Sequence, residues 1–416
     1  MRIGLVGVVR LEKRDWPGMQ RDWRKLLMGI AITAIAGFFV VRHFDSVRQN
    51  VAQRDYIQYW AAGQFLMHGG DPYDAQRALE LEWEQGYAAD RPVVVRTPPW
   101  SLFLFMPLGF VSAFWGWVLW MAASVAALIA SVRLTWKMFG KTQESRSLCV
   151  VIGYTFAPVL GCLLAAQIGL LLLVGIVLFL LWEEKRPFLA GAALLLPFAK
   201  PHLLVFFWLA FLIWVLARKR LAVAGGFAAA VAVATGMALI FDHAAFPHYF
   251  RFLHSAAIEN EFIPTVSGVL RLLLFRPYFR LQFVPMAIGL IWSVWYCVKH
   301  RRNWDWRDHG LTVMVVSILT TPYGWLTDEV VLLPAMVFAA LAILGGQKKI
   351  RVTTRIALGI FALLNWILLM LLALHIPLQL GIYFWSSLLW LAWYVYGRLE
   401  RGTKRNREPE LAAAIT

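Results

Sequence analysis

Asp55 is the residue whose type and surroundings best suit acid–base chemistry. It follows Arg54, and two large aromatic residues, Tyr59 and Trp60, lie about one helical turn further along the chain. A carboxylate near a membrane surface can take the proton of an incoming hydroxyl group. Burial beside lipid would raise the pKa of Asp55 toward that task, whereas the charge of Arg54 would oppose the rise. The alternative interpretation is a solvated aspartate in a loop.

Lys200 is the second unusual residue, because it ends the apolar run 191–199 and precedes Pro201 and His202. An ammonium group in or near hydrocarbon is costly and usually faces a cavity or a partner. The prolines on either side, Pro197 and Pro201, interrupt helix geometry at this point. We therefore expect Lys200 to bind the phosphate of an anionic lipid, with His202 beside it as a substrate-binding residue. The alternative role for Lys200 is snorkelling to the outer interface.

Two arginines are further candidates for the same phosphate. Arg96 stands at the boundary of an apolar segment, and a planar guanidinium can bind phosphate through two parallel hydrogen bonds. Arg271 lies in a short amphipathic stretch and could reach the same anion. For Arg271, snorkelling to the interface is the alternative. For the segment that Arg96 opens, RTPPW (96–100), the alternative is an interfacial helix anchored by its tryptophan.

Four more residues are candidates for contacting a substrate. Gln167 and Asp328 each open a predicted membrane span, so helix capping is the alternative role of both. Tyr73 could stack on a sugar ring, although its segment, GGDPYD (69–74), also has the composition of a tight turn. Tyr59 belongs to the aromatic surroundings of Asp55.

Motifs for metal-dependent or nucleotide-dependent chemistry are not found in the sequence. It contains no HExxH, P-loop, paired CxxC or nucleophile-elbow motif, and its first outer segment has no DxD pair. The three cysteines, Cys149, Cys162 and Cys297, lie in or beside apolar runs with a spacing that fits no metal site. We therefore expect no metal and no cofactor.

The composition predicts an integral membrane protein. Of the 416 residues, 60% are hydrophobic and only 15% are charged, whereas soluble globular proteins carry about 25% charged residues. The formal net charge of +16 comes from basic residues in short loops between apolar runs, as the positive-inside rule predicts. No basic stripe with stacking aromatic residues lies on a soluble module, so a nucleic-acid partner is not expected.

About twelve apolar stretches approach the roughly 20 residues that a helix needs to cross the bilayer. Every second loop between them is basic, so both termini are expected in the cytoplasm. The expected fold is all-α and polytopic, with one membrane domain over residues 1–398 and a disordered cytoplasmic tail over 399–416. The predicted spans are 25–41, 113–135, 148–163, 167–182, 187–200, 202–217, 221–241, 282–298, 309–323, 329–345, 356–374 and 378–396.

Two long segments, 42–100 and 242–281, are then expected on the outer side of the inner membrane. The candidate residues fall at this face once the topology is assigned, although they are scattered through the sequence. We therefore predict one site where the outer loops meet several helix ends. The elements expected near it are helices over 54–67 and 74–87, an apolar piece at or in the membrane over 100–111, and an interfacial helix over 264–279.

Five segments of the sequence, in their order and spacing, resemble a known family. The first outer segment contains DYIQYWAAGQFLMHGGDPYD (55–74) and continues with TPPWSLFLFMPLGFVS (97–112). Later come AAQIGLLLLVGIVLFLLW (165–182), RPFLAGAALLLPFAKPHLLVF (186–206) and LTTPYGWLTDEVVLLPAMV (319–337). Together they resemble the glycosyltransferases of family 87, multi-spanning GT-C enzymes that include polyprenyl-phosphate-dependent mannosyltransferases.

The resemblance implies an inverting transfer of a hexose or pentose, with mannose favoured, from a polyprenyl-phosphate donor to a lipid or glycan acceptor. By its position in the family motif, Asp55 is implied as the general base, with Lys200 and Gln167 as further site residues. Ala166 stands where the family usually has glycine, and Asp328 lies in the loop where some members have a histidine. A second acid–base residue is therefore not implied. The acceptor-binding end is the least similar part, so the identity of the substrate does not follow from the resemblance.

A transporter or flippase for a polyprenyl-linked or amphipathic solute is the alternative function. Such a protein is expected to show two similar halves and broken helices near the bilayer midplane. No such symmetry is visible in the sequence, and the long first outer segment favours an enzyme. The expected partners of the enzyme are the sugar donor, the acceptor and membrane lipids. A third alternative, a non-catalytic subunit, would not depend on Asp55.

Overall fold

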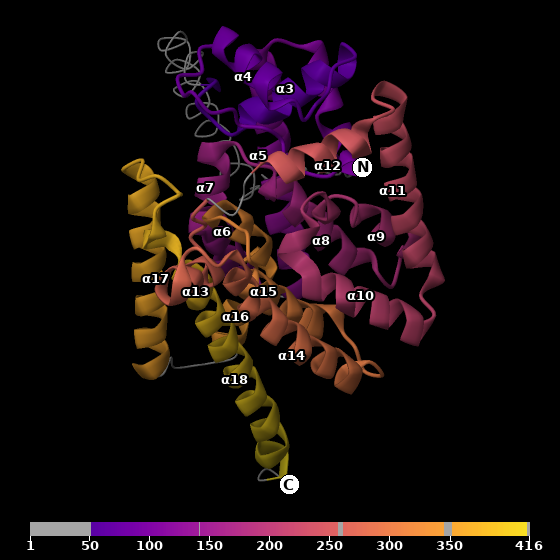
Figure 1. Ribbon diagram of the computed structural model, residues 1–416. Coiled ribbons are helices and arrows are strands. Elements are labelled where there is room, and N and C mark those ends of the chain that lie inside the picture. The colour runs from indigo at the N-terminus through magenta and orange to yellow at the C-terminus, as the bar shows by residue number, and fades with distance from the viewer. Residues whose placement is uncertain (1–50, 141, 257–260, 345–351, 414–416) are drawn as a thin grey trace, which may run out of the picture. The chain divides into compact units, whose positions relative to one another are not determined.

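The computed structural model describes residues 51–140, 142–256, 261–344 and 352–413, and every regular element in these ranges is a helix. Figure 1 shows two short helices, α3 (Tyr56–Met67) and α4 (Ala75–Glu84), side by side, far from the C-terminal end of α18. The prediction of an all-α, polytopic membrane protein is confirmed. The span predicted at 25–41 lies outside the described residues.

Six helical segments within the described ranges are long and apolar enough to cross a membrane, and a bent pair would make a seventh. The pair is α6 (Gln143–Thr155) with α7 (Ala157–Ala165), which meet at an angle of 44°. The number of about twelve spans is therefore not confirmed. Three of the six are single helices: α5 (Ala113–Phe139), α11 (Leu221–Phe241) and α17 (Val352–Ala373). In the other three, a short 3-10 helix leads into an α-helix: η4 (Pro201–Leu204) into α10 (Val205–Arg218), η6 (Phe279–Phe283) into α14 (Val284–His300), and η8 (Leu326–Leu332) into α16 (Leu333–Leu344).

Three of the predicted spans, 167–182, 187–200 and 309–323, are shorter helices. The apolar run 167–182 forms α8 (Gly169–Trp182), and 187–200 forms α9 (Pro187–Ala193) followed by a short 3-10 helix. At 1.5 Å per residue, the 14 residues of α8 and the 7 of α9 are too few to cross the bilayer alone. The remaining short elements are η3 (Pro197–Ala199), the π-helix η7 (Trp306–Gly310), α15 (Leu311–Thr320) and η9 (Gly381–Tyr383).

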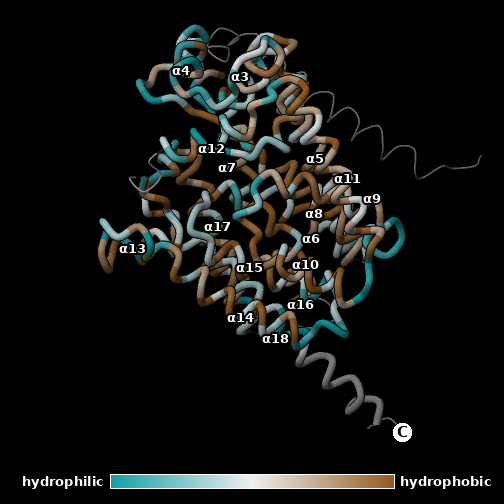
Figure 2. Tube along the Cα trace, turned by 45° about the vertical axis from the view of Figure 1, so that its right-hand side comes forward, coloured by the Kyte–Doolittle hydropathy of each residue, from teal (hydrophilic) through white to brown (hydrophobic). Residues whose placement is uncertain are grey.

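The part of the first long segment that the structure describes, 51–100, folds as the local sequence predicts. Helices α3 and α4 occupy the stretches predicted at 54–67 and 74–87, and Asp74 caps α4 by accepting two backbone N–H groups. The apolar piece over 100–111 forms two 3-10 helices, η1 (Pro99–Leu104) and η2 (Met106–Phe110). Of these, η2 packs against α3 and η1 against α11. Figure 2 shows that hydrophilic residues concentrate around α4.

The second long segment, 242–281, contains α12 (Ala245–Ser255) and α13 (Val266–Phe275) in its described residues. Helix α13 is the helix expected over 264–279, and it leads into η6 (Phe279–Phe283). Four consecutive apolar residues, 272–275, are all exposed on α13. A short helix with such a surface suits a membrane interface.

Helix α8 is the central element around the site, because it packs against α5, α9 and the 3-10 helix η8 (Leu326–Leu332). Gly169 opens α8 where it meets η8. A Cβ atom on Gly169 would lie 2.8 Å from Val330 Cγ1 and 2.9 Å from the Thr327 carbonyl oxygen. Only glycine therefore allows this close approach, which brings the start of α8 against the start of η8.

Helix α18 (Ser386–Ala413) is tied to η8 by a buried carboxylate. Glu329 accepts hydrogen bonds from the Ser386 hydroxyl at 2.8 Å and from the Trp390 indole N–H at 2.7 Å. The helix continues to Ala413, so the tail predicted to be disordered over 399–416 is helical over most of its length. The tail contains Leu, Arg, Lys, Glu and Ala, which all have high helix propensity. The prediction of disorder rested on its polar composition and did not take this propensity into account.

Candidate active site

Four polar side chains from separate parts of the chain form one hydrogen-bonded group, here termed the Asp55 network: Asp55, Gln167, Lys200 and Asp328. Gln167 donates from Nε2 to Asp55 Oδ2 at 2.5 Å, and Lys200 Nζ lies 3.4 Å from Gln167 Oε1. Lys200 Nζ also forms a salt bridge with Asp328 Oδ1 at 2.7 Å. The network is thus a chain of contacts that runs from a carboxylate through an amide and an ammonium group to a second carboxylate.

Asp55 reaches this network from the residue before α3. It occupies the N-cap position but makes no capping hydrogen bond, so its carboxylate is directed to Gln167 instead. Tyr59, four residues on and hence on the same face of α3, donates its hydroxyl to Gln167 Oε1 at 2.8 Å. Its ring stacks on Phe105 with the centroids 4.8 Å apart. Tyr59 therefore fixes the amide orientation that points Nε2 at Asp55.

Gln167 is presented by a tight turn between α7 and α8. Ala166 ends α7 in the left-handed conformation, with φ of 53°, which costs a residue other than glycine about 1–2 kcal/mol. Two hydrogen bonds hold the turn: Trp120 donates its indole N–H to the Ala166 carbonyl, and Gln167 donates its backbone N–H to Cys162, both at 2.9 Å. The strain is thus offset by contacts that set the position of Gln167.

Lys200 and Asp328 meet because both lie at helix interruptions. Lys200 separates η3 from η4 (Pro201–Leu204), and each of these begins with a proline that cannot donate a helical hydrogen bond. Asp328 lies in the first turn of η8, where Oδ2 accepts the backbone N–H of Trp325 at 3.0 Å. The Lys200 side chain is 12% exposed and that of Asp328 is 3% exposed. The two charges therefore compensate each other in a buried setting.

The electrostatic surroundings of Asp55 favour a proton acceptor. Burial raises the pKa of the Asp55 carboxyl above its ordinary value, and the charge of Asp328 acts in the same direction. The hydrogen bond from Gln167 and the charge of Lys200 act in the opposite direction. A carboxylate whose pKa is raised in this way accepts a proton more readily than an exposed aspartate does.

The sequence model of glycosyltransferase family 87 matches residues 97–322, which is more than half of the chain. The chain belongs to glycosyltransferase family 87. No curated protein and no solved structure matches it. Its family and its long apolar helices make it a membrane glycosyltransferase, so the enzyme is favoured over the transporter. Gln167 and Lys200 lie within the matched residues, whereas Asp55 and Asp328 lie on either side of them.

Arg96 of this family 87 protein is engaged by other side chains and does not join the Asp55 network. Its guanidinium forms a two-pronged contact with the Glu261 carboxylate, at 2.9 and 2.5 Å, and it donates to the Tyr323 hydroxyl at 2.9 Å. A phosphate at Arg96 would have to replace the Glu261 carboxylate. In this structure, Arg96 joins the first outer segment to the second.

Tyr73 is a packing residue in this structure. It is 3% exposed, and its hydroxyl donates to the Thr97 carbonyl oxygen at 2.9 Å. Its ring packs against Tyr249 of α12, with the centroids 5.2 Å apart. A sugar ring cannot stack on a side chain that is covered in this way. Tyr73 instead holds the turn 69–74 against the neighbouring outer elements.

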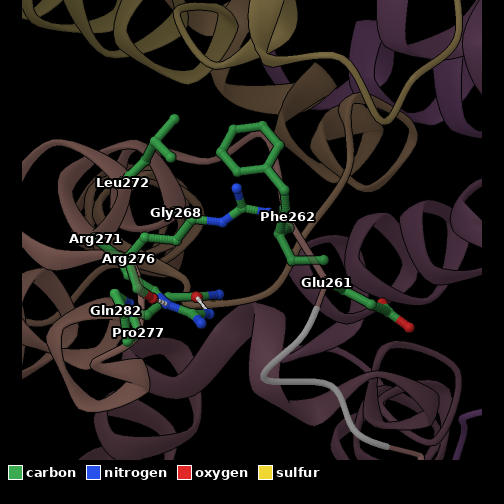
Figure 3. A pocket seen from close by; sticks show the side chains of 9 residues that line it. Glu261, Phe262, Gly268, Arg271, Leu272, Arg276, Pro277 and Gln282 are labelled. Carbon is green, nitrogen blue, oxygen red and sulfur yellow. Dashed lines mark hydrogen bonds between the residues drawn. The ribbon is translucent and has the colours of Figure 1, made fainter.

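Arg271 lines a separate cavity of ≈ 350 Å³, together with Arg276, Phe262 and Gln282. Its Nε donates to the Arg276 carbonyl at 2.7 Å and one terminal nitrogen donates to Gln282 Oε1 at 3.1 Å. Figure 3 shows the Glu261 side chain turned away from the two arginines, consistent with its pairing to Arg96. The cavity therefore offers two guanidinium groups beside the exposed apolar residues of α13.

His202 lies two residues beyond Lys200, and its ring packs edge-on against Tyr323, with the centroids 5.8 Å apart. Its Nε2 atom is buried and has no hydrogen-bond partner among the described residues. A buried polar atom without a partner is costly unless a ligand or water supplies one. His202 is thus a side chain near the Asp55 network with an unused hydrogen-bonding atom.

Three residues that the sequence interpretation did not select belong to these surroundings: Tyr323, Glu261 and Arg276. Tyr323 lies within LTTPYGWLTDEVVLLPAMV (319–337), one of the segments that carry the family resemblance, so a signal was present. Arg276 shares a short stretch with Arg271 and could have been found by the same argument. Glu261 carries no motif, and only its pairing with Arg96 reveals its role.

Proposed function

We propose that this glycosyltransferase transfers a hexose or pentose, with mannose favoured, from a polyprenyl-phosphate donor to a lipid or glycan acceptor. The observation that carries the proposal is the Asp55 network, in which a carboxylate and an ammonium group are held close together by one glutamine. This combination provides a proton acceptor for an attacking hydroxyl and a cation for a departing phosphate. The family supplies glycosyl transfer as the reaction class.

In the proposed step, Asp55 takes the proton of the acceptor hydroxyl as the acceptor oxygen bonds to the anomeric carbon of the sugar. The bond from that carbon to the phosphate oxygen breaks at the same time, and polyprenyl phosphate leaves with the bonding electrons. Attack from the side opposite the phosphate inverts the configuration at the anomeric carbon. Asp55 is the general base in this scheme, and its raised pKa suits it to hold the proton.

Lys200 is proposed to stabilise the negative charge on the departing phosphate. An ammonium group has three protons to donate. One points to Asp328, and another makes the long contact with Gln167. In the part of the chain that the structure describes, the third has no hydrogen-bond acceptor, so it can serve a phosphate oxygen. Such charge stabilisation is usually among the largest contributions to catalysis.

The remaining candidate residues are assigned supporting roles. Arg271 and Arg276 are proposed to attract the lipid phosphate, because their cavity adjoins the exposed apolar residues of α13. His202 is proposed to bind the substrate through its unpartnered Nε2, and Tyr59 to act through Gln167. Arg96 is proposed to reach the phosphate only if Glu261 is displaced.

The proposal is tested by offering the purified protein in lipid nanodiscs two donors that carry the same sugar. One is the polyprenyl-phosphate sugar and the other the corresponding nucleotide sugar, each with a panel of glycolipid and oligosaccharide acceptors. We expect transfer from the first donor alone, with inversion at the anomeric carbon seen by NMR of the product. Transfer from the nucleotide sugar, or retention of configuration, would contradict the proposal.

Gln167→Leu is expected to move the acidic limb of the pH–rate profile to higher pH. The hydrogen bond from Gln167 lowers the pKa of Asp55, so its loss lets burial raise that pKa further, and a higher pH is needed to keep the base deprotonated. The measurement is kcat/KM against pH. Tyr59→Phe removes the hydrogen bond that orients the Gln167 amide, so its acidic limb should move in the same direction but by less. An unshifted limb in Gln167→Leu would contradict the role of Asp55 as base.

The proposed location of the reaction is the outer face of the inner membrane, with both termini in the cytoplasm. Glu84 of α4 is exposed in the first outer segment, and Lys185 is exposed in a basic loop. In sealed cells, a membrane-impermeant thiol reagent is expected to label Glu84→Cys and to miss Lys185→Cys. Both should react after the cells are opened. The reverse pattern, or equal labelling in sealed cells, would invert or refute this topology.

A further inference from the structure

Asp71, Asp242 and His248 form a second cluster of side chains, which is termed the Asp–Asp–His triad below. His248 Nδ1 lies 2.8 Å from Asp242 Oδ2 and 3.4 Å from Asp71 Oδ1. One ligand atom from each of the three residues lies within 4.8 Å of the others. The triad joins the turn 69–74 to the start of α12, two segments far apart in the sequence.

The backbone holds each carboxylate of the triad in place. Asp71 Oδ1 accepts the N–H of Tyr73 at 2.8 Å, and Asp242, which ends α11, accepts the N–H of Ala244 through Oδ1 at 2.9 Å. His248 lies near the start of α12. The two carboxylates are therefore held beside His248 by their own backbone contacts, which limits the entropy lost when the three side chains bind a shared ligand.

The charge of the triad is unbalanced. Two carboxylates face one imidazole, which carries at most one positive charge, and Asp242 is only 8% exposed. No lysine or arginine within the described ranges forms a salt bridge with Asp71 or Asp242. A divalent cation would compensate this excess of negative charge, which a histidine alone does not.

We propose that the Asp–Asp–His triad binds one divalent transition-metal ion, Zn²⁺ in preference to Mg²⁺ or Ca²⁺, that clamps the turn 69–74 to α12. Two ligands bound to one ion at about 2.1 Å stand about 3 to 3.4 Å apart. The His248 Nδ1 atom lies at comparable distances, 2.8 and 3.4 Å, from the two carboxylates. The imidazole favours Zn²⁺, because Mg²⁺ and Ca²⁺ prefer oxygen ligands alone. Three protein ligands leave a position for water.

The clamp is separate from the transfer reaction proposed above. No side chain of the triad makes a hydrogen bond or an ion pair with Asp55, Gln167, Lys200 or Asp328 among the described residues. The metal would also order the residues around Tyr73. The Tyr73 ring packs on Tyr249, next to His248 in the chain, and the Tyr73 hydroxyl donates to the Thr97 carbonyl. The metal is thus inferred to order the outer segments rather than to activate a substrate.

The test uses the full-length protein in lipid nanodiscs, with any purification tag removed and bound metal stripped by a chelator. We expect elemental analysis after dialysis against Zn²⁺ to find one equivalent per chain, and the melting temperature to rise with Zn²⁺ but not with Mg²⁺ or Ca²⁺. Asp242→Asn and His248→Gln should each weaken Zn²⁺ binding about a hundredfold or more. His254→Gln is the control, because His254 is an exposed histidine on the same helix and should leave binding unchanged.

Zn²⁺ binding by Asp242→Asn equal to that of the unaltered protein would overturn the proposal. So would a stripped protein that takes up no Zn²⁺, in which case the triad is a histidine paired with two carboxylates. Should the variants fail to fold, Co²⁺ is added to the unaltered protein. One equivalent with visible absorption that Zn²⁺ abolishes supports the site, and the absence of such a spectrum refutes it.

Discussion

Asp55→Asn is expected to slow sugar transfer about a hundredfold or more while leaving the protein folded. The asparagine oxygen can still accept the hydrogen bond that Gln167 donates to Asp55 in the unaltered protein, so the Asp55 network keeps its geometry. What is lost is a group basic enough to take the acceptor proton. The measurement is the initial rate at saturating donor and acceptor, with the melting temperature as the check on folding.

Asp90→Asn is the matched control for this experiment. Asp90 belongs to the same outer segment as Asp55 but is exposed, so its loss should leave both rate and melting temperature unchanged. If a folded Asp55→Asn variant transferred sugar at nearly the normal rate, another group would have to accept the proton. The Asp55 network would then be a structural feature of the protein.

Lys200→Met is expected to damage both the fold and donor binding, for two separable reasons. The substitution leaves Asp328, which is 2% exposed, as a buried carboxylate without its cation, at a cost of about 3–5 kcal/mol in stability. It also removes the proposed contact with the donor phosphate. A charge-assisted hydrogen bond of that kind is worth about 1.5–3 kcal/mol, so donor affinity should fall about tenfold to a hundredfold.

A double variant separates these two effects. Adding Asp328→Asn to Lys200→Met removes the unpaired carboxylate, so we expect much of the lost stability to return. Donor affinity should not return, because the ammonium group is still missing. Thermal unfolding reports the first effect, and titration of donor and acceptor in nanodiscs reports the second. Asp328→Asn alone leaves the buried ammonium group of Lys200 without its anion, so this variant should also be less stable. It keeps Lys200, however, and should therefore keep donor binding.

Recovery of donor affinity in the double variant would show that Lys200 serves the fold through Asp328 and does not hold the donor. A change confined to the acceptor titration would lead to the same conclusion. The structure makes this distinction necessary, because the sequence alone presented Lys200 as a cation whose partner was an external phosphate. Its salt bridge to Asp328 shows an internal partner as well.

The short helices of the outer segments were predictable because local signals specify them. The aspartate at position 74 precedes α4 as a cap, and prolines at 99 and 107 begin the 3-10 helices that replace a regular apolar helix. The number of membrane spans was harder to predict from the sequence. Helix α8 is as apolar as a lipid-facing helix but only 14 residues long, and it is largely buried inside the protein. Hydropathy does not distinguish burial in protein from exposure to lipid.

The candidate site was predictable only in part, for a similar reason. Asp55, Gln167, Lys200 and Asp328 stand out because polar groups beside apolar runs are costly, and the structure brings them together. Arg96 and Tyr73 stand out equally in the sequence, yet they pair with Glu261 and Thr97 instead. Whether a polar side chain meets a substrate or another residue depends on partners that are distant in the chain.

Composition, apolar run length and motif order are properties of the chain, so they were enough to predict a helical membrane protein from a family of glycosyltransferases. Which charges compensate one another depends on the folded structure. The pairing of Lys200 with Asp328, the turn at Ala166 that aims Gln167 at Asp55, and the meeting of Asp71 with Asp242 and His248 each depend on how elements pack. Such contacts act over a few ångströms between residues far apart in sequence, so no local pattern records them.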